Sequence, residues 1–248
     1  MATLFKNALL FFVPFSFVFW YVHHQFETAI FRSIQNGLSG FYSADGLIFG
    51  FLVAFVINRE WEIWTKLSES VRTEIDAVRE LWKWSVYADS SLCDEAHRHL
   101  EGYLKNIVSE WYKGGETERS KSVDDELDAL RGMLGKLSTS AGSVSFQLQS
   151  ALTHLIESRN QRLNFSNEHM PGILKRTVVF ADILFIFLSL FIAVNNLYVD
   201  YIFTAAISLL AFTLVLVVDD LDNPFRSGTW HITPAGYEAL LVELTRRT

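Results

Sequence analysis

Hydrophobic and polar positions are distributed very unevenly along this chain. Four apolar segments, residues 5–22, 41–57, 178–198 and 201–218, contain almost no charge. Each comes close to the roughly 20 helical residues that cross a hydrocarbon core of about 30 Å. Between the second and third segments, apolar residues recur instead at spacings of three and four, which indicates amphipathic helices, and no long stretch has the period of a strand. The pattern predicts an all-α membrane protein with four transmembrane helices and a helical region between spans two and three.

The predicted organisation has four parts. Residues 1–58 hold transmembrane helices 1 and 2, residues 59–172 form the helical region, residues 173–218 form a transmembrane hairpin of spans 3 and 4, and residues 219–248 form an acidic segment and a C-terminal tail. The second span is expected to continue as one helix to about residue 87, because residues 51–101 contain neither Gly nor Pro. Further helices are expected near residues 90–113, 122–137 and 143–164. Only Val199 and Asp200 separate the last two spans, which predicts a tight turn there.

Basic residues near the spans predict the orientation. Lys6, Arg59, Lys175, Arg176 and Arg226 all fall on one side of a four-span arrangement, and the opposite side keeps only Arg32. By the positive-inside rule, both termini and the helical region are expected in the cytoplasm. The aromatic residues at the end of the first apolar segment occupy the place of a cleavage site, so this segment is interpreted as a retained span and not a signal peptide.

Composition narrows the possible functions. Half of the 248 residues are hydrophobic, the formal net charge is −7, and there is one cysteine. A single cysteine excludes a disulfide framework within the chain. The acidic balance and the absence of Lys/Arg runs argue against nucleic acid as a partner. No hydrolase triad order, metalloprotease motif, phosphate loop or dinucleotide-binding glycine pattern occurs, so the chain is not expected to be an enzyme.

Carboxylates provide the candidate chemistry. Asp219, Asp220, Asp222 and Asn223 follow the fourth span directly and offer hard oxygen ligands of the kind that Ca²⁺ takes. They lack the spacing of a helix-loop-helix calcium site, so other segments would have to complete the shell. The alternative is simple helix termination before Pro224, with the carboxylates solvated or paired with arginine. No cofactor is required; Ca²⁺ at this acidic segment is the one candidate.

Asp182 is an ionisable residue near the start of the third span. Such a residue is costly in a membrane and usually faces protein or water. It is interpreted either as part of a permeation path or as a capping or pairing group beside Lys175 and Arg176.

Two motifs resemble those of bestrophins. Residues 46–64, GLIFGFLVAFVINREWEIW, are similar to the span that lines the bestrophin pore, and residues 219–225, DDLDNPF, are similar to the acidic segment after the last bestrophin span. Residues 71–78, VRTEIDAV, and 222–234, DNPFRSGTWHITP, resemble the bestrophin-like domain family still more closely. The resemblance in topology covers nearly the whole chain, whereas the specific motifs cover short stretches.

The resemblance implies an oligomer, a pentamer in bestrophins, in which copies of the second span surround an axial pore. When the Gly-Phe pair of the bestrophin span is aligned with Gly50-Phe51, the constriction positions correspond to Ser43, Leu47 and Phe51. Their spacing of four places them on one face of a helix, as a pore lining needs, and rings of Leu and Phe can gate by dewetting. Without the resemblance, packing of Leu47 and Phe51 against a neighbouring span would be the simpler interpretation.

Selectivity is left open between anions and cations. Bestrophins of animals conduct anions, which the resemblance implies here. Asp45 near the outer mouth, and Glu60 and Glu62 at the cytoplasmic end of the same helix, would favour monovalent cations if they face the axis.

The expected function is therefore passive ion conduction by a homo-oligomer in a lipid bilayer, specifically a bacterial inner membrane. The alternative is a non-conducting membrane scaffold or sensor whose cytoplasmic helices bind a partner.

Overall fold

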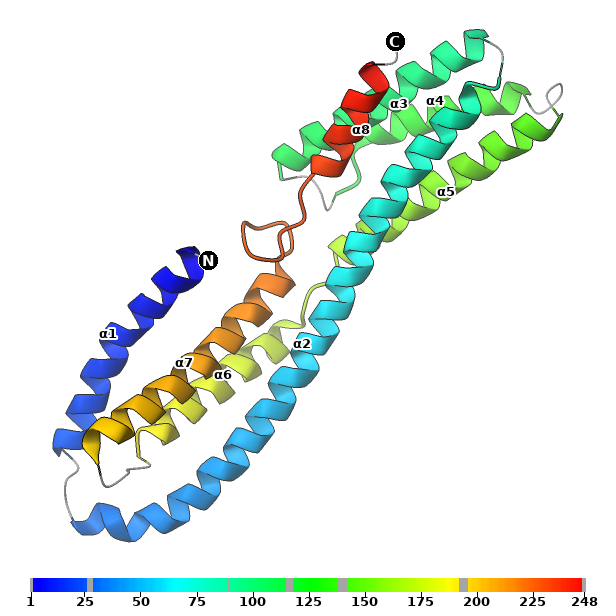
Figure 1. Cartoon of the computed structure of the whole chain (residues 1–248). Helices are drawn as coiled ribbons and strands as arrows, with labels where there is room; N and C mark the ends of the chain where they lie inside the picture. The colour runs from blue at the N-terminus through cyan, green and yellow to red at the C-terminus, as the bar shows by residue number, and fades with distance from the viewer. Residues whose placement is uncertain are drawn as a thin grey trace. The chain divides into compact units, whose positions relative to one another are not determined.

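The computed structural model describes residues 2–25, 29–88, 90–114, 118–137, 142–191 and 196–246. Within these ranges the chain forms α-helices and no strand, which confirms the all-α prediction (Figure 1). The helices are α1 (Ala2–Gln25), α2 (Ala29–Ser85), α3 (Ser90–Tyr112), α4 (Lys121–Leu137), α5 (Gly142–Ser166), α6 (Gly172–Ser189), α7 (Leu197–Asp222) and α8 (Ala235–Thr245).

The chain divides into two compact units. The first, here called the apolar unit, comprises Met1–Trp61 and Met170–Trp230, and the second, here called the polar unit, comprises Glu62–His169 and His231–Thr248. Helix α2 contributes to both, because it passes the predicted boundary at residues 58–59 without a break. Its start at Ala29 lies well before the predicted span, whereas its end at Ser85 is close to the prediction.

Helices α1, α6, α7 and the first part of α2 build the apolar unit. Helix α7 packs against α6 and against α1 (Figure 1). One cluster of buried side chains joins α2, α6 and α7 around Phe49, Val53, Val56 and Val178. A second cluster, centred on Phe15 and Phe19, joins α1 to α7. Close packing of aromatic rings between helices therefore holds this unit together.

Two of the four predicted spans meet the length and apolarity that a membrane crossing needs. They are the part of α2 over Leu38–Ser85 and helix α7, Leu197–Asp222, among the residues that the structure describes. Helix α6 is short and includes Lys175, Arg176 and Asp182. The four-span topology stays a prediction.

The predicted hairpin turn at Val199 and Asp200 is wrong. Helix α6 ends at Ser189, and α7 begins at Leu197 with Asn196 as its N-cap. The Asn196 side chain accepts hydrogen bonds from the backbone N–H groups of Tyr198, at 3.0 Å, and Val199, at 3.3 Å. These bonds satisfy donors that a helix start leaves unpaired, so the helix begins before Val199 although the apolar pattern continues through it.

Helices α3, α4, α5, α8 and the second part of α2 build the polar unit. Helix α3 packs against α4 and α8, and α4 packs against α5. Most apolar residues that recur at the helical spacing in this region are buried, and Leu67, Leu100, Leu130, Leu148 and Leu155 are among them. The helical period of the sequence therefore identified this core correctly.

Helix α8 was not predicted, because residues 219–248 were interpreted as an acidic segment and a tail. Pro234 stands at its N-cap, and Tyr237, Leu240 and Leu244 are buried on one face. Their spacing of three and four is the signal that sequence reasoning missed. Helix α7 continues to Asp222 and so contains most of the acidic residues, which agrees with the predicted alternative of helix termination before Pro224.

Candidate functional site

Helix α2 carries the candidate pore residues on a face that the other described residues of the chain leave largely exposed. Leu47 is 62% exposed and Phe51 is 70% exposed. Ser43 is exposed as well, and its hydroxyl donates to the Ser39 carbonyl at 2.9 Å within the same helix. The spacing of four residues and the shared exposure place Ser43, Leu47 and Phe51 along one line of the helix surface.

The opposite face of α2 is fixed by Phe185 of α6. The rings of Tyr42 and Phe49 stack on the Phe185 ring, with centroids 4.9 Å and 5.3 Å away. A Cβ atom at Gly46 would lie 2.9 Å from Cε2 of Phe185, so a larger residue there would push this ring away. Gly46 therefore permits the close approach, and the rotation of α2 that exposes Leu47 follows from it.

The three predicted pore-mouth carboxylates do not share one environment. Glu60 is buried, and one carboxylate oxygen of Asp45 is buried with no hydrogen-bond partner among the described residues. The Glu62 side chain is 61% exposed and pairs with Lys66 at 2.7 Å, one turn further along α2. Glu62 is therefore the most exposed of these three acids in the single chain.

The acidic segment is held by a lysine from α6. The Lys175 ammonium lies 2.7 Å from Asp219 Oδ1 and 2.9 Å from Asp222 Oδ2. The second oxygen of Asp222 accepts from the backbone N–H of Met170 at 2.8 Å. These carboxylates therefore tie the start of α6 to the end of α7.

The rest of the acidic segment also binds protein groups. Asp220 accepts from the backbone N–H of Thr229 at 2.8 Å, and the Asn223 amide donates to the carbonyl of Asp219 at 2.8 Å. In the described ranges, no three His, Cys, Asp or Glu side chains gather in a way that could hold a metal ion. Calcium binding at Asp219, Asp220, Asp222 and Asn223 stays a prediction.

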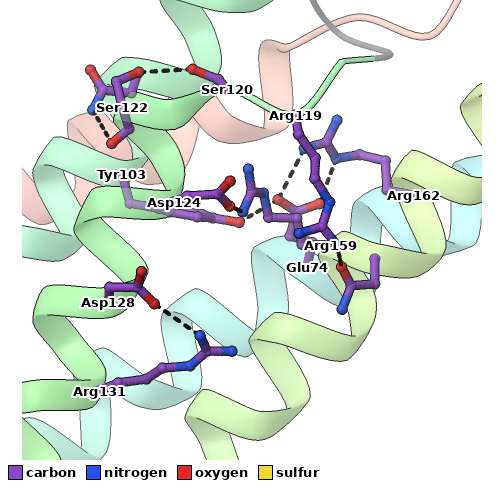
Figure 2. A network of polar contacts seen from close by, with 12 residues as sticks. Glu74, Tyr103, Arg119, Ser120, Ser122, Asp124, Asp128, Arg131, Arg159 and Arg162 are labelled. Carbon is purple, nitrogen blue, oxygen red and sulfur yellow. Dashed lines mark hydrogen bonds and ion pairs between the residues drawn. The ribbon is translucent and has the colours of Figure 1, made fainter.

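Sequence reasoning missed a buried charged network in the polar unit (Figure 2). Glu74 of α2 accepts from the Arg162 guanidinium of α5 at 2.6 Å and from the Tyr103 hydroxyl of α3 at 2.6 Å. All three side chains are buried, and the Trp111 ring lies 5.9 Å from the Arg162 guanidinium carbon. Three helices therefore meet at one carboxylate.

The network shifts the pKa values of several of its titratable side chains. Burial, followed by the charge of Glu74, raises the pKa of the Tyr103 hydroxyl well above its ordinary value, and the same two causes act on Tyr237 of α8. Burial alone would lower the pKa of Arg162, but the charge of Glu74 and its hydrogen bond raise it. With their pKa values raised, both tyrosines stay neutral at physiological pH. The signal in the sequence was a carboxylate at position 74 on the apolar face between Val71 and Val78.

Comparisons with known proteins agree with this architecture. The model of the bestrophin-like domain family matches residues 9–237. Among solved structures, a membrane protein carrying a proline-to-alanine substitution matches with a TM-score of 0.75 and 13% identity, over 99% of this chain and 98% of the other. A variant of a bacterial bestrophin homologue from Klebsiella pneumoniae matches with a TM-score of 0.72 and 14% identity, over 98% and 97% of the two chains. At such identities these structures show the fold alone.

The search of curated proteins gives no match. The family match covers nearly the whole chain, from the first apolar helix to the start of α8. The chain therefore belongs to the bestrophin-like family, a family of membrane-embedded proteins whose characterised members are ion channels and not enzymes.

Proposed function

We propose that this chain assembles as a homopentamer in a bacterial inner membrane and forms an ion channel. The axial pore is lined by α2, with Ser43, Leu47 and Phe51 toward the axis. Conduction is passive, so no catalytic residue is involved. Both termini and the polar unit lie in the cytoplasm. The observation that supports this proposal is the uncovered face of α2, in a family whose characterised members are channels.

The composition of this face favours a pore over lipid contact. Exposed small or polar residues, Gly40, Ser43 and Gly50 among them, lie on this stretch of α2 together with the exposed apolar residues Leu47, Ile48, Phe51 and Phe55. The exposed face of α6 differs after Thr177, because it holds large apolar residues, Phe180, Ile183 and Phe187 among them, and no small or polar residue. A lipid-facing surface gains from continuous apolar side chains, whereas a pore needs space between its constrictions.

Rings of Leu47 and Phe51, one helical turn apart, would form the constriction. A narrow apolar ring lets water leave the pore, which stops ions without a moving plug. Replacing either residue with Ala widens and wets the ring, so we expect larger currents. Ser43 gives a wider and more polar ring on the outer side.

The charge near the pore decides which ion passes. The family resemblance points to anions, whereas Glu62, exposed beyond the constriction, favours monovalent cations. The cation becomes the stronger choice if Glu62 faces the axis in the oligomer. Glu62→Gln then shifts the reversal potential toward the chloride equilibrium potential.

The test is the reversal potential of the purified protein in planar bilayers under a KCl gradient, with Leu47→Ala and Phe51→Ala beside the unchanged chain. Matched controls come from Leu210 of α7, also 62% exposed, and Phe180 of α6, 66% exposed. We expect the α2 variants to raise the conductance about twofold or more by wetting the constriction, and the two controls to leave it unchanged.

If a folded oligomer gives no current, with and without Ca²⁺, the channel proposal is overturned and the scaffold or sensor is favoured. In that alternative, Leu47 and Phe51 are contact residues between subunits or partners. Equal effects of all four variants would overturn the pore assignment alone. Native mass spectrometry of the same samples gives the number of subunits.

The orientation has its own test, because the chain contains one cysteine. Cys93 lies in α3 of the polar unit and is partly exposed. In intact cells, a membrane-impermeant maleimide should label it only after lysis. A second variant, Cys93→Ser with Tyr198→Cys at the start of α7, should react without lysis. Labelling of Cys93 in intact cells would reverse the orientation.

A further inference from the structure

A polar cleft lies between α4 and α5 of the polar unit, apart from the α2 face. Its volume is about 340 Å³, at the lower end of the range of about 300–1,000 Å³ that holds small-molecule ligands. Three arginines line it: Arg119 just before α4, Arg131 on α4 and Arg159 on α5 (Figure 2). A cleft of this size with guanidinium groups on several sides has the composition of an anion site.

Arg159 gives the cleft a fixed positive charge. Its side chain is buried, with 5% exposed, and it donates to Asp124 of α4. Its Nε atom is buried and has no hydrogen-bond partner among the described residues. A buried guanidinium that is only partly hydrogen-bonded favours a further acceptor beside it.

The other two arginines can be recruited by a ligand. Arg119 donates to the neutral oxygen of Asn160 at 2.7 Å, so its bond to that residue neutralises no charge. Arg131 donates to Asp128 at 2.9 Å, but both side chains are more than half exposed. Exposed pairs at this spacing are weak, so an oxyanion can displace Asp128 easily.

The lining as a whole favours an anion that also carries a small aliphatic part. Three arginines against Asp124 and Asp128 leave one net positive charge, and the apolar contacts come from Leu127 and Ile156. No aromatic ring is among the lining residues, so a nucleobase has no stacking surface there. Paired N–H groups of arginine fit the oxygens of a phosphate.

We propose that this cleft binds a small phosphate monoester, with Arg119 and Arg131 as the ligand-contacting residues and Arg159 as the buried charge behind them. The bound phosphate would link Arg119, just before α4, to Arg131 of α4 and so add a contact within the polar unit. This site is independent of the ion pathway, since none of its residues lies on α2.

The experiment is isothermal titration calorimetry of the full-length protein in detergent at about 150 mM NaCl, where diffuse ion attraction is screened beyond about 8 Å. The probes are glycerol 3-phosphate, inorganic phosphate and glycerol. We expect glycerol 3-phosphate to bind, inorganic phosphate to bind more weakly and glycerol not to bind. Equal affinity for glycerol 3-phosphate and inorganic phosphate would contradict the contact with the aliphatic part and would indicate a site for phosphate alone.

Variants identify the contacts. Arg119→Gln and Arg131→Gln should each weaken glycerol 3-phosphate binding about tenfold, the usual effect of losing one charge-assisted hydrogen bond. Arg119→Lys keeps the charge but not the paired N–H donors. Its affinity for glycerol 3-phosphate should lie between those of the unchanged protein and Arg119→Gln. Arg98→Gln, exposed on α3 outside the cleft, is the matched control. Absence of binding, or equal weakening by Arg98→Gln, would overturn the proposal; circular dichroism confirms that each variant is folded.

Discussion

Two buried acidic residues, Glu74 in the polar unit and Asp182 in the apolar unit, have opposite surroundings. In the polar unit, Glu74 is surrounded by Arg162 and Tyr103 and makes short hydrogen bonds to both. In the apolar unit, Asp182 is buried just as well, yet one of its carboxylate oxygens has no hydrogen-bond partner among the described residues. Removing the first acid is therefore expected to destabilise the protein, and removing the second is expected to stabilise it.

This difference shows what holds each unit together. In the polar unit, helices of different sequence regions converge on charged and hydrogen-bonded groups as well as on leucines. In the apolar unit, contacts between rings such as Phe11 and Phe212, with centroids 4.9 Å apart, join the helices beside a mainly aliphatic cluster. Between membrane helices the hydrophobic effect gives little, so close packing has to supply the energy.

The largest expected effect is at the centre of the network. Glu74→Gln leaves Arg162 buried without its counter-charge, and we expect a loss of about 3–5 kcal/mol from the stability of the polar unit. Hydrogen–deuterium exchange of peptides from α5 measures this unit by itself. Glu69→Gln, exposed on the same helix, is the control. A loss below about 1 kcal/mol would mean that the pair adds nothing beyond a surface ion pair.

The next effect is at Tyr103. Tyr103→Phe removes a hydrogen bond to a charged acceptor, which should cost about 1.5–3 kcal/mol. The substitution also changes how the folding stability depends on pH. The pKa of Tyr103 is raised in the folded protein, so above pH about 10 the unfolded chain loses this proton first and stability falls as the pH rises.

The variant should therefore lose less stability than the unchanged chain between about pH 9 and 11, roughly one unit either side of the ordinary tyrosine pKa. Chemical denaturation followed by tryptophan fluorescence at several pH values measures this slope. Identical slopes for the two proteins would exclude Tyr103 as a source of the alkaline loss, and Tyr237→Phe then tests the second buried tyrosine.

In the apolar unit, removing the buried acid should raise the stability and not lower it. Asp182→Val removes a carboxylate with an unsatisfied oxygen and keeps a similar volume, so we expect a gain of about 1–3 kcal/mol. The midpoint temperature of the detergent-solubilised oligomer measures it, and Val178→Ala, a buried neighbour on α6, controls for packing on that face. A clear loss of stability would show that Asp182 binds an ion or a group from another subunit.

The smallest effect is expected at the surface of α2. Glu62 and Lys66 form a pair at 2.7 Å, but about half or more of each side chain is exposed to solvent. Lys66→Met should therefore leave the stability of the polar unit nearly unchanged. The same exchange experiment on peptides from α2 measures it. A larger change would indicate that Lys66 acts through the Phe165 ring, 6.0 Å from its ammonium.

Sequence reasoning succeeded where one helix decides its own structure. The period of Leu100, Ile107 and Leu155 gave the buried faces of α3 and α5, and the spacing of Leu47 and Phe51 gave a common face of α2. It failed at helix ends, because Asn196 begins α7 through side-chain bonds that apolarity does not reveal. Helix α8 was overlooked for a related reason, since a short helix after a proline resembles a tail in composition.

By itself, the sequence determined the helical class, the apolar and amphipathic segments and the family, because these depend on periodicity and on short motifs within single segments. Only the tertiary structure decided which acids are paired, buried or exposed. Glu60 and Glu62 differ by two positions, yet one is buried and the other stands in solvent. Successive residues point about 100° apart around a helix, so the neighbours that each one meets are set by packing between distant segments.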